Sequence, residues 1–270
     1  MTPTSASWVP ASTAASSAPD PSCVGPPGGT CAIHQPNLFP RLSTLAKLYA
    51  ADRWIVLDDV QFARRDYQHR TRLASLDDPG RQQWLTLPTH LPHGRATLIS
   101  QARLVDPRRS RRTVELLVRQ YYRRSRHWGA VREVLDSVLD ALDTTERVAG
   151  IARTSTIALL TALGWSGEVL DSSDIPTRRG RSERLADLAA ASGSAQYLCG
   201  TGGLRYLDIG PFDASGIPVL PFRLPAATDD PLWRWAGRSS SLWALSRIGY
   251  GEMTNQLTER RDAPRLGAPA

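Results

Sequence analysis

The amino-acid sequence predicts an α/β domain with a mostly parallel central sheet and a helical insertion in the middle of the chain. Three observations lead to this prediction. Short apolar runs of strand type alternate with helical patterns in the first and last thirds, the first runs form a strand–helix–strand unit, and three amphipathic patterns fill the middle. With 270 residues the chain can bury a large core, and we expect one domain over residues 30–260.

The first predicted unit is a strand, a loop, a helix and a second strand. An apolar run over residues 31–34 stops at the Gln-Pro that follows, because proline cannot continue a central ladder. A helix is predicted over residues 42–51 and a buried strand over residues 53–58. Such units normally pair their strands in parallel, so His34 and Asp58 should end adjacent strands at the carboxyl edge of the sheet.

A hairpin and three helices are predicted next. Residues 70–75 and 83–88 flank the turn signal Asp-Asp-Pro-Gly, which suggests a hairpin at a sheet edge. Thr144 or Thr145 can cap the third of the helices and Gly164 can end it. From apolar residues at three- and four-residue intervals, the helices are predicted over residues 111–122, 131–142 and 146–163.

The last third returns to alternating strands and helices, and the final helix should end at Gly249. Residues 1–29 form an Ala/Ser/Pro-rich arm whose one charged residue is Asp20, so we expect this arm to be disordered. Residues 261–270 should be a frayed tail. Strands are predicted over residues 168–171, 196–199 and 219–223, and helices over residues 182–192 and 239–249.

The net charge of +7 comes almost wholly from arginine, because Lys47 is the one lysine in the sequence. Two interpretations of Lys47 remain open: the position requires a compact ammonium group, or the side chain is an ordinary exposed charge. The arginines favour an anionic partner. A phosphate-bearing small molecule or an acidic acyl or amino-group carrier protein would fit. Nucleic acid ranks last, since no binding motif or aromatic platform accompanies the arginines.

The cysteines and histidines match no metal-binding pattern. Cys23, Cys31 and Cys199 are too few for a disulfide framework, and the five histidines show no ligand spacing around them. We predict no metal and no cofactor. The start of the chain lacks the basic and apolar regions of a secretory signal, and no run reaches the roughly 18 apolar residues of a membrane span. We therefore expect a cytoplasmic protein with no membrane contact.

Several short motifs, none specific alone, occur in an order and spacing that resemble the WbqC-like family over about residues 31–249. The resemblance implies an α/β fold with its site near these motifs, and a place in bacterial surface-polysaccharide or other secondary biosynthesis, but no particular reaction. Two departures stand out: His69-Arg70 replaces a common Asn-Arg pair, and Cys199 stands where many members have Ser or Asn. The motifs are His34-Gln35-Pro36, Phe39-Pro40, Lys47 in a helix, Asp58-Asp59-Val60-Gln61-Phe62, Arg70, Trp84-Leu85-Thr86-Leu87-Pro88, Ser172-Ser173-Asp174 and Gly202-Gly203 followed by Arg205-Tyr206-Leu207-Asp208.

The sharpest catalytic hypothesis pairs His34 with Cys199, each at the carboxyl end of a predicted strand. A neighbouring base can activate a thiol, and Asp58 could orient the imidazole. This arrangement would suit an amide-forming acyl- or aminoacyl-transferring enzyme that acts on a thioester donor and an amine. In that case Cys199→Ser should abolish turnover. The alternative is that Cys199 is a buried small apolar residue, as free cysteines usually are.

Two other functions remain open. The loop after the first strand could instead hold ATP in a nucleotidyl-transferring or ligase-type enzyme, although Pro36 and Pro40 remove N–H donors that a phosphate site would use. A non-catalytic protein that binds a carrier protein is the third possibility. The residues expected to bind substrate are Gln35, Lys47, Gln61, Arg70, Ser173, Gly202, Gly203 and Tyr206.

Overall fold

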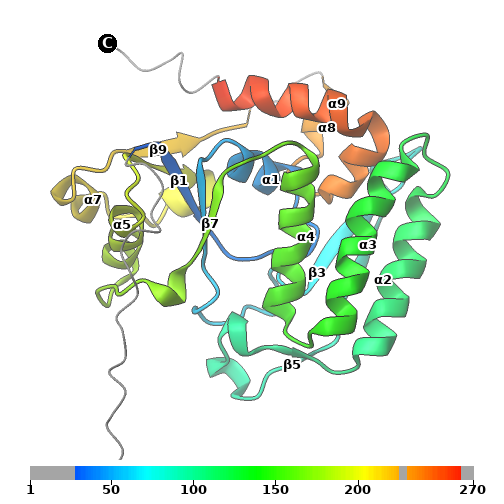
Figure 1. Ribbon diagram of the computed structural model, residues 1–270, viewed down its shortest axis with the longest axis horizontal. Helices are drawn as coiled ribbons and strands as arrows, with labels where there is room; N and C mark the ends of the chain where they lie inside the picture. The colour runs from blue at the N-terminus through cyan, green and yellow to red at the C-terminus, as the bar shows by residue number, and fades with distance from the viewer. Residues whose placement is uncertain (1–27, 225–229, 263–270) are drawn as a thin grey trace, which may run out of the picture.

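A five-stranded sheet forms the centre of the molecule (Figure 1). The computed structural model describes residues 28–224 and 230–262. All strand pairings in this sheet are parallel. The predicted α/β class with a mostly parallel sheet is confirmed. Most of the predicted arm, residues 1–27, lies outside the described residues, as do residues 225–229 and 263–270. The sheet contains β1 (Thr30–His34), β2 (Arg53–Val56), β7 (Glu168–Asp171), β8 (Gln196–Gly200) and β9 (Val219–Phe222), in the order β7-β2-β1-β8-β9.

This strand order reverses direction at β1. The chain moves outward from β1 through β2 to β7, then returns to place β8 on the other side of β1 and β9 beyond it. In open α/β sheets the connecting segments diverge at such a point and leave a crevice at the carboxyl ends of the two strands, where ligands bind. The topology therefore directs attention to the ends of β1 and β8.

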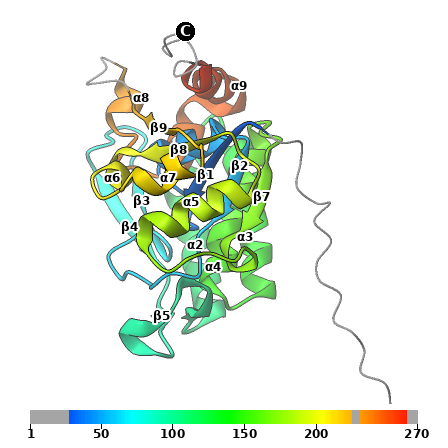
Figure 2. The same cartoon turned by 90° about the vertical axis from the view of Figure 1, so that its left-hand side faces the viewer.

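Helices cover both faces of the sheet (Figures 1 and 2). Alternate residues of each strand point to opposite faces. Ala32 and Leu198 belong to the larger apolar core, which includes residues of α1, α4 and α9. Cys31 and Tyr197 belong to a smaller core with residues of α5 and α7. The helices are α1 (Leu42–Tyr49), α2 (Pro107–Tyr122), α3 (Trp128–Thr144), α4 (Val148–Ala162), α5 (Arg181–Ala191), α6 (Thr201–Leu204), α7 (Gly210–Ala214), α8 (Pro231–Arg234) and α9 (Ser241–Asp262).

The helical insertion lies between β2 and β7, as predicted, with α2 and α3 forming an outer layer beyond α4 (Figure 1). Helix α2 begins earlier than the apolar pattern suggested, because Asp106 caps it and Pro107 occupies its first turn. Thr145 is not the cap of α4; its hydroxyl accepts from the N–H of Arg147, which is the cap residue. Gly164 ends α4 with a positive φ of 78°, as expected.

The predicted hairpin forms but does not join the central sheet. Its strands β3 (Arg70–Ala74) and β4 (Gln82–Thr86) make a separate two-stranded sheet. The expected place at a sheet edge is therefore wrong, because other parts of the chain satisfy the hairpin: the N–H of Ala74 donates to the Tyr122 hydroxyl at 3.2 Å, and Ser240 donates its N–H to the Arg72 carbonyl. Smaller elements of the insertion are β5 (Thr89–His90), β6 (Arg103–Leu104) and the 3-10 turns η2 (Gly94–Ala96) and η3 (Ile99–Gln101); η4 (Ser172–Asp174) follows β7.

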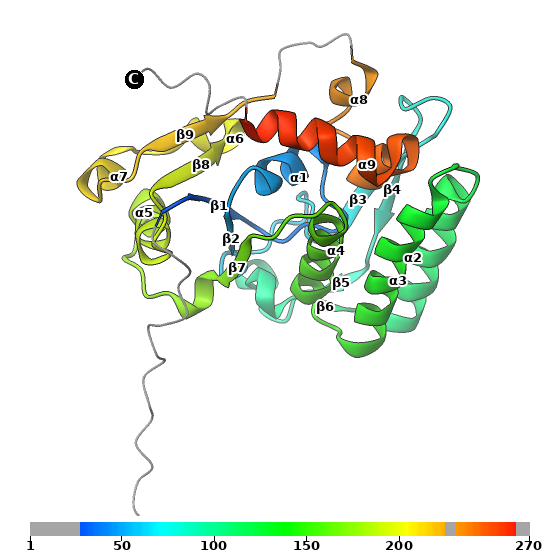
Figure 3. The same ribbon diagram turned by 45° about the horizontal axis from the view of Figure 1, so that its top comes forward.

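The last helix is interrupted, not ended, by Gly249. This residue has φ 74° and ψ −177°, and a Cβ at this position would lie 2.5 Å from Nδ1 of His127, so glycine is required on both grounds. Beyond the kink α9 continues to Asp262, two residues into the predicted tail, and packs over α1 (Figure 3). None of the described helices is long and apolar enough to cross a bilayer.

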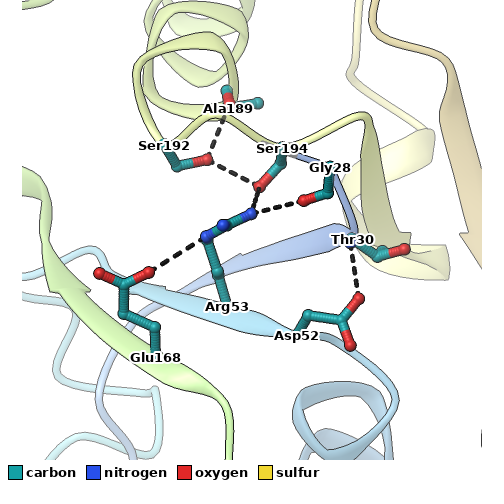
Figure 4. A network of polar contacts seen from close by, with 8 residues as sticks. All are labelled: Gly28, Thr30, Asp52, Arg53, Glu168, Ala189, Ser192 and Ser194. Atoms are coloured by element: carbon teal, nitrogen blue, oxygen red, sulfur yellow. Dashed lines mark hydrogen bonds and ion pairs between the residues drawn. The ribbon is translucent and has the colours of Figure 1, made fainter. Parts of the chain in front are cut away.

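Polar contacts join the strands at the amino edge of the sheet (Figure 4). Arg53 opens β2 and is 5% exposed; its Nε donates to Glu168 of β7 at 3.1 Å, and its Nη1 donates to the Gly28 carbonyl at 2.6 Å. The same Nη1 reaches Ser194 before β8 at 3.4 Å. One buried guanidinium thus connects the chain before β1 to β7 and β8, and it holds the sheet in register beneath the site.

Candidate functional site

A cavity of about 1290 Å³ opens at the carboxyl edge of the sheet, at the reversal point between β1 and β8. The ends of four strands, one side of α1 and the segment before α5 form its wall. Because these segments come from distant parts of the sequence, only the folded sheet brings them together. The lining residues that the following argument uses are His34, Gln35, Arg41, Lys47, Asp59, Gln61, Arg178, Arg179, Arg181, Arg184, Cys199, Gly202, Gly203 and Arg223.

His34 presents a neutral imidazole to this cavity. Its Nδ1 lies 2.8 Å from the Gln35 carbonyl oxygen, which can only accept, so Nδ1 carries the proton and Nε2 carries the lone pair. Burial, and next the charge of Lys47, lower the pKa of His34 well below its usual value. Nε2 has no hydrogen-bond partner within the described chain. The ring is therefore ready to accept a proton from a ligand at neutral pH.

Lys47 is a buried cation with no carboxylate partner among the described residues. It projects from α1, is 6% exposed, and its Nζ donates to the Ile33 carbonyl at 3.3 Å. Burial lowers the pKa of Lys47 to about 8, although Coulombic interactions with Cys199 and Cys31 act in the opposite direction. An ammonium group in such surroundings is costly unless a negative charge joins it. Of the two interpretations of this lysine, the buried position contradicts that of an ordinary surface charge.

Gln35 is held by a neighbour that the sequence analysis did not single out. Gln68 is fully buried, and its Nε2 donates to Oε1 of Gln35 at 2.6 Å. With its carbonyl oxygen engaged in this way, Gln35 keeps its amide N–H groups for other acceptors. Gln35 lines the cavity directly after His34, so a base and a donor are adjacent.

Arginines surround the cavity opening, and most of them were missed in the sequence. Four come from around the start of α5: Arg178 and Arg179 precede the helix, and Arg181 and Arg184 lie in its first two turns. The missed signal was the run Arg-Arg-Gly-Arg that begins at residue 178, between a predicted strand and a predicted helix. Two of the arginines are paired: Arg178 with Asp187 at 2.7 Å, and Arg184 with Asp59. Within the described residues the others, Arg41, Arg179, Arg181 and Arg223, form no ion pair.

The family model for the WbqC-like protein family matches residues 35–225, about 71% of the chain. The chain belongs to the WbqC-like protein family. The matched range begins directly after His34 and includes the other segments of the cavity wall, so the cavity lies in the part of the chain typical of the family. The resemblance identified from the motifs is therefore confirmed.

One curated relative also has a similar sequence. The uncharacterized protein Rv1507c of Mycobacterium tuberculosis is 26% identical over 192 residues, which are 71% of this chain and 80% of the relative. No solved structure matches the chain. The chemistry of this WbqC-like protein therefore has to be inferred from its own cavity.

Cys199 and His34 line the same cavity, as predicted, but their side chains leave opposite faces of the sheet and no hydrogen bond joins them within the described residues. Along β8 Cys199 shares a face with Tyr197 and packs in the smaller core under α5 and α7, whereas His34 shares a face with Ala32, on the α1 side. Cys199 borders the cavity but is only 1% exposed, and a Cβ on Gly203 would lie 2.8 Å from its Sγ. Burial raises the pKa of the Cys199 thiol. The sulfur therefore packs in the smaller core, because Cys199 lies on the face of β8 that is turned toward α5 and α7.

Asp58 and Arg70, which were predicted to belong to the site, do not line the cavity. Asp58 follows the end of β2 by two residues and does not orient His34, whose Nδ1 is bonded to a backbone carbonyl. Burial raises the pKa of Asp58, and Asp171 and Asp59 raise it further. Arg70 belongs to the separate hairpin, where its guanidinium lies 4.3 Å from the ring centroid of Trp84 and donates to two backbone carbonyls.

The remaining predicted binders divide into two groups. Gln61, Gly202 and Gly203 line the cavity, and Gln61 donates to the Arg95 carbonyl. Ser173 is exposed beside Asp174, and Tyr206 is 67% exposed outside the cavity, so neither lies in the wall. Among the described residues, no group of three or more His, Cys, Asp or Glu side chains is placed to hold a metal ion.

Proposed function

We propose that this WbqC-like protein is a cytoplasmic acyl- or aminoacyl-transferring enzyme of a biosynthetic pathway, which joins the acyl group of a phosphate-bearing thioester to an amine. The observation that supports this most is the neutral His34 at a cavity where cations without carboxylate partners gather. A base and an excess of positive charge are what an amine nucleophile and an anionic donor require.

The transfer is direct, from thioester to amine, without an enzyme-bound acyl group. The amine nitrogen attacks the thioester carbonyl while Nε2 of His34 accepts a proton from it. The carbonyl oxygen gains negative charge, which the Lys47 ammonium and the Gln35 amide N–H groups stabilise. The C–S bond then breaks, the thiolate takes the proton from His34, and an amide and a free thiol are released.

An ATP-dependent enzyme is the second candidate, because the strand order and the position of the cavity are those at which α/β proteins often bind nucleotides. Two observations favour it less. The first N–H groups of α1 already donate to protein: Ser43 to the Ala236 carbonyl at 3.0 Å and Leu42 to the Ser239 carbonyl at 3.4 Å. Asp59, the carboxylate of the cavity wall, is paired with Arg184 and accepts from Ser172.

A coupled assay tests the proposal and separates it from the alternative. The protein is incubated with acetyl- or glycyl-coenzyme A as donor and hydroxylamine as a small amine acceptor, and hydroxamate and free thiol are measured. We expect His34→Gln to slow turnover by about 10²- to 10⁴-fold, the usual contribution of a positioned general base. Cys199→Ala is the matched control and should retain turnover. Hydroxamate formation that depends on ATP would support the second candidate, and thiol release no faster than in buffer would exclude the first.

A further inference from the structure

We infer that the surface beside the cavity opening binds an acidic carrier protein, which delivers the acyl group on a phosphopantetheine arm. This inference rests on the proposed acyl transfer and adds the form of the donor. The carrier surface, as we define it, consists of Arg179, Arg181, Arg205, Tyr206 and Ile209.

Two large apolar side chains of the carrier surface are exposed without a covering partner. Tyr206 is 67% exposed and Ile209 is 56% exposed, two of the four large apolar side chains that are this exposed among the described residues. Exposed apolar groups among charged ones are typical of protein-binding surfaces. A small donor enclosed by the cavity would leave these two side chains in water, whereas a protein partner would cover them.

The carrier surface is continuous with the cavity wall. The guanidinium of Arg181, which lines the cavity, lies 5.3 Å from the ring centroid of Tyr206. The N–H of Asp208 donates to the Ser182 hydroxyl at 2.9 Å, which ties the segment after α6 to the first turn of α5. A protein seated here would hold a flexible arm directly at the opening.

The charge of the carrier surface is positive and not neutralised within the described chain. Arg179, Arg181 and Arg205 form no ion pair, and all three are exposed. Of the nearby carboxylates, Asp187 is paired with Arg178, whereas Glu183 beside Gly180 and Asp208 form no ion pair within the described residues, so the three arginines outnumber the unpaired carboxylates. An acidic protein surface complements this arrangement, which speeds encounter and selects the partner.

Helix α2 provides a matched control surface. It also has exposed arginines, Arg108 and Arg112, and an exposed Leu116 at 60%, but it belongs to the insertion on the opposite side of the molecule from α5 (Figure 1). The two surfaces therefore have similar compositions, but only the carrier surface adjoins the cavity. Arg112→Glu with Leu116→Ala is the control for Arg205→Glu with Tyr206→Ala, a pair that leaves the cavity wall intact.

The experiment compares two donors that share one thioester. Acetyl-pantetheine and the acetylated form of a bacterial type II acyl carrier protein are supplied with hydroxylamine, and kcat/KM is measured for each. We expect the carrier-bound donor to be preferred at least tenfold at low salt, and this preference to fall as salt rises. Arg205→Glu with Tyr206→Ala, two residues outside the cavity wall, should lower kcat/KM for the carrier-bound donor by tenfold or more and change that for acetyl-pantetheine less than twofold. The α2 control should change neither.

The outcomes separate this inference from the proposed function. Turnover of acetyl-pantetheine without any preference for the carrier-bound donor, or an equal loss with both donors in the Arg205 and Tyr206 variant, would overturn the inference and leave acyl transfer standing. An equal loss in the α2 control would also overturn it, since the effect would then be one of general charge. Absence of turnover with both donors would overturn the proposed function itself.

Discussion

Two buried cations lie at opposite edges of the same sheet, and the protein treats them differently. Arg53, at the amino edge, is 5% exposed and bonded to Glu168, Gly28 and Ser194. Lys47, at the carboxyl edge, is 6% exposed, and within the described residues its Nζ donates only to the Ile33 carbonyl. The two cations are therefore equally buried, but Arg53 has a full set of hydrogen-bond acceptors and Lys47 does not.

The difference separates stability from function. A buried charge that is fully paired costs little overall, whereas one without a counter-ion opposes folding. At the amino edge Arg53 therefore joins the strands, and at the carboxyl edge the Lys47 ammonium remains available to bind an anionic ligand. If this comparison is correct, the same substitution at the two cations should change stability in opposite directions.

Arg53→Met should have the largest effect on stability. It leaves the Glu168 carboxylate and the Gly28 carbonyl without their donor, and breaking a buried pair on one side costs about 3–5 kcal/mol. Urea unfolding followed by circular dichroism measures this loss. Arg81→Met is the matched control, because Arg81 is 84% exposed in its pair with Asp78 and such pairs contribute about 0–1 kcal/mol. Similar losses for both variants would remove the distinction between buried and exposed pairs.

Lys47→Met should raise the free energy of unfolding while lowering turnover. The folded protein binds the Lys47 proton less tightly than the unfolded chain, since its pKa falls from 10.5 to about 8. Removing this buried charge should stabilise the protein by about 1–3 kcal/mol at pH 7. The same urea titration, together with the hydroxamate assay, checks both effects. A destabilised variant would mean that Lys47 is part of the packing and not a reserved charge.

The pH dependence of kcat/KM follows from the same two groups. Turnover requires the Lys47 ammonium, which is lost as the pH rises through about 8, so kcat/KM should fall about tenfold per pH unit above that value. No acid limb should appear near pH 6.5, because the pKa of His34 lies well below that value and its imidazole stays neutral. In Lys47→Arg the alkaline limb should vanish, since arginine keeps its charge. An unchanged limb in this variant would assign the titration to another group.

The sequence predicted the elements well where the apolar pattern is local. Strands β1, β2 and β7 and helices α1 and α5 lie within a few residues of their predicted ranges, because each is determined by neighbouring residues. Contacts between distant segments could not be predicted. His34 ends β1, whereas Cys199 lies one residue before the end of β8. Whether two such residues share a face depends on how the strands align, and an offset of one residue reverses the face.

The same limit explains the other corrections to the site. Arg70 was selected from the order of the motifs, but its hairpin forms a separate sheet, and no local pattern tells which sheet a hairpin joins. Lys47 was selected because it is the one lysine in the sequence. This observation concerns composition, so it does not depend on how the strands are arranged. The arginines around the start of α5 were overlooked because the sequence does not show that this segment lies beside a cavity, and without that position its charge does not indicate a binding role.

Cys199→Ser should have the smallest effect, and it tests the correction to the site most directly. The thiol is 1% exposed and packs beside Gly203 in the smaller core, so turnover should stay within about twofold of the unsubstituted protein. Placing a hydroxyl in this apolar core should cost about 1–3 kcal/mol of stability. Comparison of hydroxamate formation with the urea midpoint separates the two quantities. If turnover were abolished while the fold stayed intact, Cys199 would be a nucleophile after all, and the carboxyl edge would have to open toward α5 during the reaction.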